Sequence, residues 1–199
     1  LYYAMEYLEG LDLRDLVRRF GPLPAGRAVY LLTQACDSLR EAHRQGIVHR
    51  DIKPSNLFLC RLGDNYDFLK VLDFGLARDL TVSGASVQLT QEGSTAGTPA
   101  FMAPEIALGT SPAEATSDLY SLGCVAYWLL TGADVFEGKA PMQVMFAHAK
   151  EKPTPPSMRT ESPIPGDLER IVLWCLEKEP EDRPDRKSTR LNSSHANIS

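Results

Sequence analysis

Three short apolar segments separated by polar turns constrain this chain most: IVHRD at 47–51, NLFLC at 56–60 and LKVLDFG at 69–75. Short runs of apolar, β-branched and aromatic residues bounded by turn residues are typical of strands. The polar stretch RLGDNYD at 61–67 predicts a hairpin between the last two. The charged and amide residues of HRDIKPSN then fall on loops at strand ends, where an ordinary solvated turn is the alternative interpretation.

Helical periodicity surrounds these strands. Helices are predicted over 12–19 and 26–45, and then, beyond a polar surface loop at 79–98, over 116–131, 141–150 and 166–178. His43 and His148 fall on these helices and have the character of ordinary helix residues. The apolar face predicted for 26–45 consists of Val29, Leu32, Ala35, Leu39 and Ala42.

The sequence also predicts where the first strand ends and where the helix at 116–131 begins. The opening LYYAMEYLEG predicts a strand that ends at Gly10, and Thr116 or Ser117 is the expected N-cap of the strongly apolar helix at 116–131. Together these elements predict an α+β fold that is mostly helical with short β-hairpins.

Composition limits the function classes. The chain has 199 residues, 43% hydrophobic and 24% charged, which suits one globular core. Its net charge of −5 does not favour a broad basic surface, so we expect no nucleic-acid partner. The longest apolar run, at 122–130, is too short for a bilayer, so we expect no membrane segment in this chain. Four dispersed cysteines favour neither a zinc site nor a disulfide framework, which suits a reducing, cytoplasmic setting.

Three oxygen-bearing side chains occur in a distinctive order: Asp51, Asn56 five residues later, and Asp73. Phosphoryl transfer from ATP needs Mg²⁺ held by hard oxygen ligands, and we expect Asn56 and Asp73 to be those ligands. Asp51 is the candidate to orient an attacking hydroxyl and accept its proton, while Lys53 is suited to stabilise charge on the transferred group. A DFG or an HRD alone is common by chance, but the two in this order, followed by GTPAFMAPE, make coincidence negligible.

The segments HRDIKPSN, DFG, GTPAFMAPE and DLYSLG resemble the eukaryotic-type Ser/Thr protein kinase family, in a form similar to its bacterial members. The resemblance covers residues 1 to about 185. It implies that 1–9 form the last strand of the small lobe and the hinge, and that 10–185 form the large lobe, truncated before its final helix. We expect 186–199, which are polar and aperiodic, to be an unrelated, artefactual tail.

The resemblance implies an ATP site. Met5 would be the gatekeeper behind the adenine pocket, and the backbones of Glu6 and Leu8 would bind the adenine edge. Asp12 falls where an acidic side chain meets the ribose, and Phe58 would form the floor under the base. Plain core packing is the alternative interpretation of Met5 and Phe58.

The resemblance also implies the acceptor. Lys53 followed by Pro54 points to proteins with Ser or Thr acceptors, and Thr98 supports this, since that position hydrogen-bonds toward Asp51 and Lys53 in Ser/Thr kinases. Thr98 is thus a further expected catalytic residue.

Structural roles follow by the same comparison. Glu105 would pair with Arg183 as part of the scaffold, and His49 would pack on Phe74. Asp118 would hold the backbone of the loop that carries Asp51, although a carboxylate at a helix start is also favoured by the helix dipole.

Regulation is implied by Arg50, a cation that we expect to be buried beside Asp51. Arg78 would join it to receive a phosphate on the activation loop, with Ser94 and Thr95 as the acceptors. An ordinary Ser/Thr-rich loop is the alternative.

The family's Gly-rich loop and the strand lysine that grips the phosphates fall before the segment that begins at Leu1. We therefore expect an amino-terminal part of the domain to be missing and this chain alone to be inactive, with the parent active and cytoplasmic or membrane-anchored. Two alternatives remain, a pseudokinase-type binding scaffold and a small-molecule phosphotransferase.

Overall fold

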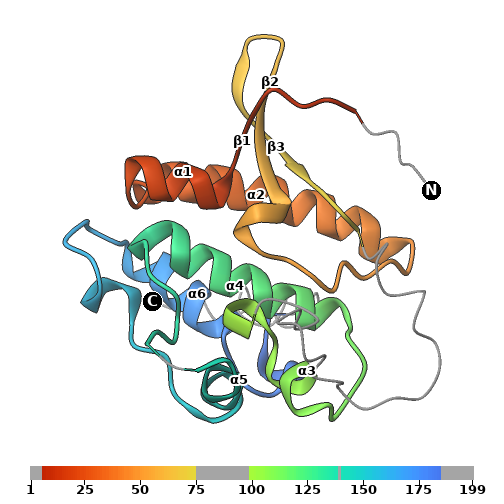
Figure 1. Cartoon of the computed structure of the whole chain (residues 1–199), viewed down its shortest axis with the longest axis vertical. Helices are drawn as coiled ribbons and strands as arrows, with labels where there is room; N and C mark the ends of the chain where they lie inside the picture. Colours follow the sequence, from red (N-terminus) through yellow and green to blue (C-terminus); the bar gives the residue numbers. More distant parts are fainter. Residues whose placement is uncertain (1–5, 75–98, 139, 185–199) are drawn as a thin grey trace, which may run out of the picture.

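The computed structural model of the chain describes residues 6–74, 99–138 and 140–184. A small antiparallel sheet stands at one end of a helical body, which confirms the predicted α+β class (Figure 1). The strands are β1 (Gly10–Asp12), β2 (Leu57–Leu62) and β3 (Asn65–Val71). The helices are α1 (Leu13–Phe20), α2 (Ala25–Arg44), α3 (Pro104–Leu108), α4 (Ala115–Thr131), α5 (Pro141–Lys150) and α6 (Gly166–Cys175). Short 3-10 turns lie at Pro54–Asn56, Pro99–Phe101, Pro156–Met158 and Pro180–Asp182.

The sheet has the order β1-β2-β3, and β2 and β3 form the predicted hairpin. Of the strand predicted over 1–10, residues 1–5 lie outside the described ranges. Its predicted end is wrong, because residues 6–9 form no strand and β1 begins at Gly10. A Cβ atom at Gly10 would lie 1.9 Å from the carbonyl oxygen of Leu59. This glycine therefore permits β1 to approach β2 closely, rather than ending a strand.

The segment 47–51 is also not a strand, although its apolar residues predicted one. The backbone amides of His49 and Arg50 donate to a side chain, that of Asp118, instead of to a neighbouring strand. A local apolar run cannot reveal this, since the partner lies in α4.

The apolar face of α2 differs from the predicted one by a small rotation. Ala35 and Leu39 are buried as expected, but Val29 is 44% exposed. Apolar residues occupy two adjacent helical registers in this segment, so periodicity alone could not choose between them. The buried positions of α2 are Ala28, Leu31, Ala35 and Leu39.

Polar side chains of α2 fix the hairpin in place. The Gln34 amide donates to the carbonyl oxygen of Asp67 at 2.9 Å and accepts from the backbone N–H of Leu69 at 3.0 Å. Arg27 donates twice to the Asp67 carboxylate, at 2.9 and 2.7 Å. Gln34 thus covers the outer edge of β3, which would otherwise present unpaired backbone groups.

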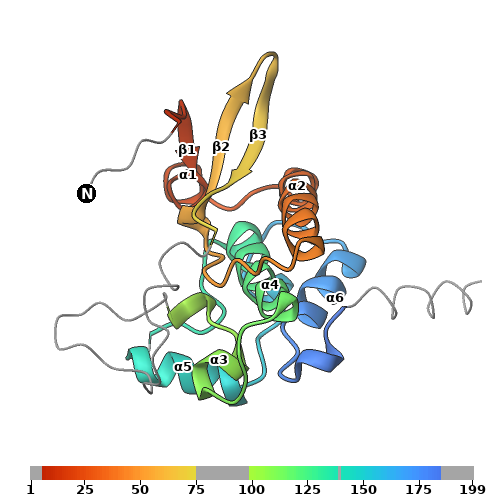
Figure 2. The same ribbon diagram turned by 90° about the vertical axis from the view of Figure 1, so that its right-hand side faces the viewer.

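Helix α4 lies at the centre of the helical body, packed between α2 and α6 (Figure 2). A Cβ at Gly123 would lie 2.8 Å from the Cβ of Cys175, so this glycine permits close packing of α4 on α6. The predicted N-cap of α4 is wrong: the N-cap is Glu114, and Ser117 accepts a hydrogen bond from its backbone N–H at 3.1 Å. The Ser117 hydroxyl thus reaches back from the first turn of the helix.

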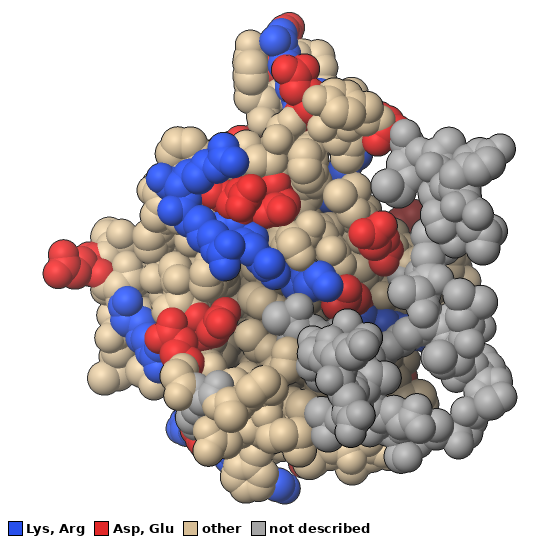
Figure 3. Space-filling view, in the orientation of Figure 1, with Lys and Arg blue, Asp and Glu red and all other residues tan. Residues whose placement is uncertain are grey.

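The surface has mixed charge around α1, whose three arginines accompany Asp15. Figure 3 shows Lys and Arg next to Asp and Glu across this face, and Arg19 lies 3.7 Å from Asp15. Of the helices in the described ranges, none combines the length and the apolar character that crossing a membrane requires.

Candidate active site

The loop 47–56 is held by one buried carboxylate. Asp118 in the first turn of α4 is 1% exposed. Its Oδ2 accepts from the backbone N–H of His49 at 2.8 Å and its Oδ1 from that of Arg50 at 2.9 Å. The ring Nε2 of His43, at the end of α2, donates to the same Oδ2 at 2.8 Å. These charge-assisted bonds fix the loop just before Asp51.

Asp51, Lys53 and Asn56 meet in this loop. The Lys53 ammonium lies 2.6 Å from Oδ2 of Asp51. The Asn56 side-chain amide donates to the carbonyl oxygen of Asp51 at 2.8 Å and to its Oδ2 at 3.1 Å. The Asp51 side chain remains 39% exposed, so an outside group can reach it.

Asp73 lies two residues after the end of β3, next to Leu72, whose backbone bonds that of Asn56. The N–H of Leu72 donates to the carbonyl oxygen of Asn56 at 2.8 Å, which fixes the end of β3 beside the 3-10 turn that contains Asn56. Asp73 itself is exposed and has φ of 59°, and Arg50 has φ of 70°. Left-handed backbone at residues other than glycine costs about 1 to 3 kcal/mol and clusters at functional sites.

His49 links the loop to the residues after β3. Its Nε2 lies 2.8 Å from the carbonyl oxygen of Leu72, and the N–H of Asp51 donates to its Nδ1 at 3.3 Å. These partners require a proton on Nε2 and a free lone pair on Nδ1. The ring centroid lies 4.7 Å from that of Phe74, so the structure brings these two predicted partners together.

A second group lies along one row of the sheet. Phe58 pairs in register with Asp12 on one side and with Lys70 on the other. Lys70 lies 2.6 Å from the Glu6 carboxylate, so Glu6 reaches the same row, while Leu8 is half-buried nearby in sequence. Asp12 lies before α1 rather than within it, and its Oδ1 accepts from the Asp15 N–H at 2.8 Å as the helix N-cap.

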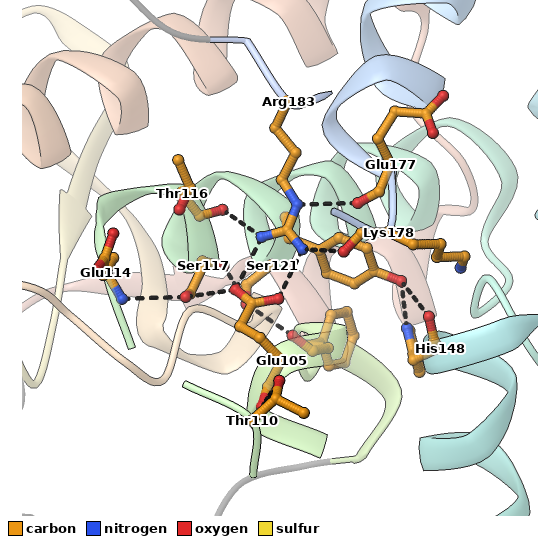
Figure 4. Close-up of polar contacts among 12 residues, drawn as sticks. Glu105, Thr110, Glu114, Thr116, Ser117, Ser121, His148, Glu177, Lys178 and Arg183 are labelled. Atoms are coloured by element: carbon orange, nitrogen blue, oxygen red, sulfur yellow. Dashed lines mark hydrogen bonds and ion pairs between the residues drawn. The ribbon is translucent and has the colours of Figure 1, made fainter. Parts of the chain in front are cut away.

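The buried pair Glu105 and Arg183 ties α3 to the segment after α6 (Figure 4). Arg183 is 1% exposed and donates to Glu105 at 2.9 and 2.7 Å. Its remaining N–H groups bond the carbonyl oxygens of Glu177, Thr116 and Lys178, so all five donors are used. Ser117 donates to Glu105 at 2.6 Å. Burial alone would raise the pKa of Glu105, but the bonds from Arg183 and Ser117 outweigh it and hold the pKa below its usual value.

A model of the family described as Protein kinase domain matches residues 1–193. The chain belongs to this family. The match extends beyond residue 185, where the sequence predicts that the kinase domain ends, and that boundary stays a prediction.

Relatives at 40% identity or more place the chain beside bacterial protein kinases. It is 43% identical over 182 residues to serine/threonine-protein kinase PknB of Mycobacterium tuberculosis, covering 92% of this chain and 28% of PknB. It is 43% identical to Pkn1 of Myxococcus xanthus, covering 92% of this chain and 25% of Pkn1. A crystal structure of Rad53 1–466 in complex with AMP-PNP has 26% identity and a TM-score of 0.70, covering 90% of this chain and 42% of that one. The predicted kinase fold and family are thereby confirmed, and the chain spans about a quarter of the length of its curated relatives.

Several predicted kinase residues lie outside the described ranges, and one expectation is wrong. The expectation that Arg50 is a buried cation is wrong, because the residue is exposed. The residues predicted from the sequence that fall outside the described ranges are Met5, Arg78, Ser94, Thr95 and Thr98.

Two histidines of the kinase domain have contacts that sequence reasoning missed. His43 is a partner of Asp118, but nothing in the local pattern of α2 marks it. His148 in α5 is fully buried, with Nδ1 2.9 Å from the Tyr120 hydroxyl (Figure 4). Burial, aided by the nearby Lys178 ammonium, lowers the pKa of His148 to about 3, so the ring is neutral.

Lys178 is unusual among the described cations. Its Nζ is buried without a hydrogen-bond partner in the described part of the chain, and lies 5.0 Å from the ring centroid of Phe136 and 5.9 Å from that of Tyr120. Burial lowers the pKa of Lys178 to about 8. Cation–π attraction offsets part of the desolvation cost.

Proposed function

We propose that this chain is part of the catalytic domain of a Ser/Thr protein kinase, which transfers the γ-phosphoryl group of ATP to Ser or Thr hydroxyls of proteins. The observation that carries the proposal is the contact of Asp51 with both Lys53 and Asn56 in a loop held by Asp118. The names of the bacterial relatives support the acceptor class.

Asp51 is the proposed base. Its contacts with Lys53 and Asn56 both fall on Oδ2, so Oδ1 is available to an acceptor hydroxyl. General-base catalysis of this kind contributes about 10²- to 10⁴-fold. Lys53, held beside the carboxylate, is placed to stabilise negative charge on the phosphoryl group as it is transferred.

The donor atoms suit a magnesium–nucleotide complex. The NH₂ group of Asn56 is engaged by Asp51, which orients the amide and leaves its carbonyl oxygen Oδ1 as a hard ligand. In the described ranges no cluster of three His, Cys, Asp or Glu side chains could hold a metal ion. Mg²⁺ suits such a site because it takes few protein ligands and completes its shell with water and phosphate oxygens. Asn56 and Asp73 are the proposed ligands, and the bound ion would neutralise phosphate charge.

The row of residues on the sheet is the proposed nucleoside side of the site. Phe58 lies between Asp12 and Lys70 in register, so an apolar ring is flanked by polar groups. The second carboxylate oxygen of Asp12, the one not used for capping, is suited to a ribose hydroxyl. Glu6 and Leu8 would contribute backbone groups to the adenine edge, and Met5 would lie behind it.

Thr98 is a further proposed catalytic residue. The proposed regulatory residues are Arg50, Arg78, Ser94 and Thr95. Because Arg50 is exposed, it is open to a phosphate on Ser94 or Thr95. Mass spectrometry of the active complete protein is expected to find phosphate on one of these two residues, and unmodified peptides would contradict this part of the proposal.

The function is tested by labelled phosphate transfer from γ-labelled ATP in the complete protein that contains this chain. The wild type is expected to label Ser and Thr in a protein acceptor, and Asp51→Asn to lower the rate by about 10²- to 10⁴-fold. Asp64→Asn, in the exposed hairpin turn, is the matched control and is expected to behave as wild type. Nucleotide binding without any transfer would favour a binding scaffold and overturn the proposal.

A further inference from the structure

One face of α4 contacts two segments of the site at once. Asp118 holds the loop that contains Asp51, as described above. One turn later, Ser121 donates to the backbone carbonyl oxygen of Phe101 at 2.7 Å (Figure 4). Phe101 belongs to the 3-10 turn Pro99–Phe101, which leads to α3. The first two turns of α4 therefore fix these segments relative to each other.

The Ser121 bond is a specific tertiary contact. A serine in a helix ordinarily bonds the carbonyl oxygen four residues earlier. Here that atom, the Ser117 oxygen, lies 3.2 Å from the hydroxyl, whereas the Phe101 oxygen lies at 2.7 Å. A hydroxyl has one hydrogen, so the shorter contact takes it. Among the described residues, Ser121 donates this hydrogen bond to the carbonyl oxygen of Phe101. Phe101 itself is only 8% exposed.

A small hollow separates the two segments. Its volume is about 30 Å³, which is enough to hold water. Asp51 and Ile52 line it from the loop, Phe101 and Met102 from the facing segment, and Ser121 from α4. The Ser121 bond therefore holds the wall that faces Asp51.

We propose that Ser121 is a positioning residue for the acceptor: it holds residues 99–103 so that a peptide docked on them presents its hydroxyl to Asp51. This inference rests on the proposed function. It makes Ser121 a determinant of acceptor binding and not of nucleotide binding, because its bond touches the 99–103 segment and none of the residues proposed for ATP.

The test compares Ser121→Ala, Ser121→Thr and Thr33→Ala in the complete protein. Ser121→Ala removes the hydroxyl, and Ser121→Thr keeps it. Thr33→Ala is the matched control, because the Thr33 hydroxyl makes the ordinary bond to the Val29 carbonyl oxygen within α2, at 2.8 Å. We expect Ser121→Ala to raise the KM for a Ser-containing acceptor peptide by about 2- to 12-fold, the equivalent of one net hydrogen bond. The KM for ATP is expected to stay within about twofold, and Ser121→Thr to restore the acceptor KM.

Hydrogen exchange gives a readout that needs no catalysis. In Ser121→Ala, the backbone amides of residues 99–106 are expected to exchange about 2- to 12-fold faster, the factor expected for the acceptor KM. The exchange rates of the amides in α2 are expected to stay unchanged. If the wild type transfers no phosphate but exchange responds in this way, the proposed function fails, and only the structural restraint of residues 99–103 by Ser121 stands. Unchanged acceptor KM and unchanged exchange at 99–106 would overturn the inference, as would an equal rise in the KM values of peptide and ATP.

Discussion

Removing the carboxylate of Glu105 is expected to be among the most costly single substitutions in the chain. Arg183 is 1% exposed, and Glu105 supplies two of the five acceptors of its guanidinium. Glu105→Ala would leave a buried cation without its counter-ion, and would also remove the acceptor of the Ser117 hydroxyl. Breaking a buried ion pair from one side costs about 3 to 5 kcal/mol, so we expect the free energy of unfolding to fall by this amount.

Urea unfolding at pH 7 measures this loss, with Asp167→Ala as control. Asp167 pairs with Arg170 on the surface, where both side chains are largely exposed, and its loss is expected to cost less than about 1 kcal/mol. The double variant Glu105→Leu, Arg183→Met is expected to be more stable than Glu105→Ala, because no charge remains buried. If Glu105→Ala cost no more than the surface control, the reasoning would be refuted.

Three further predictions concern buried titratable groups and the loop. The folded pKa of His148 is about 3, below its ordinary value of 6.5, so between these two pH values the unfolded chain binds one more proton than the folded chain. In urea titrations, the wild type should therefore lose stability relative to His148→Gln as the pH falls from 6.5 to 3. The folded pKa of Lys178 is about 8, below its ordinary value of 10.5, so between these two pH values the unfolded chain binds the extra proton. From pH 8 to 10.5 the free energy of unfolding of the wild type should therefore rise relative to that of Lys178→Met, by about 1 to 2 kcal/mol after allowance for partial exposure. A difference between the two proteins that does not change with pH would count against a buried ammonium. His43→Phe should speed amide exchange at His49 and Arg50, and exchange equal to wild type would show that Asp118 needs no help from α2.

Local patterns predicted the parts of the fold that depend on neighbours in sequence. The β2–β3 hairpin lies where apolar runs flank a polar turn, and α5 occupies the predicted residues. Asp51 and Asn56 are only five residues apart, and Asn56 ends the short turn Pro54–Asn56, so their contact is local and could be expected from their spacing.

Long-range contacts could not be predicted from local pattern. Arg183 lies 78 residues from Glu105, and only resemblance to the kinase family pointed to that pair. The partner of His43 lies 75 residues away in α4, and no local signal marks it. Arg50 is the opposite case: the family resemblance suggested a buried cation at this position, but the residue is exposed.

In the proposed active site, Asp51, Asn56 and Asp73 surround one metal–nucleotide complex. The most direct measurement is NMR line broadening of this chain by Mn²⁺ with AMP-PNP, because a paramagnetic ion broadens nearby signals even when it binds weakly. We expect the Asn56 side-chain amide and the backbone amides of Asp51 and Asp73 to broaden first, and Asn56→Ala to weaken the broadening of the Asp51 and Asp73 amides. Broadening confined to other parts of the chain, with these three signals unchanged, would contradict it.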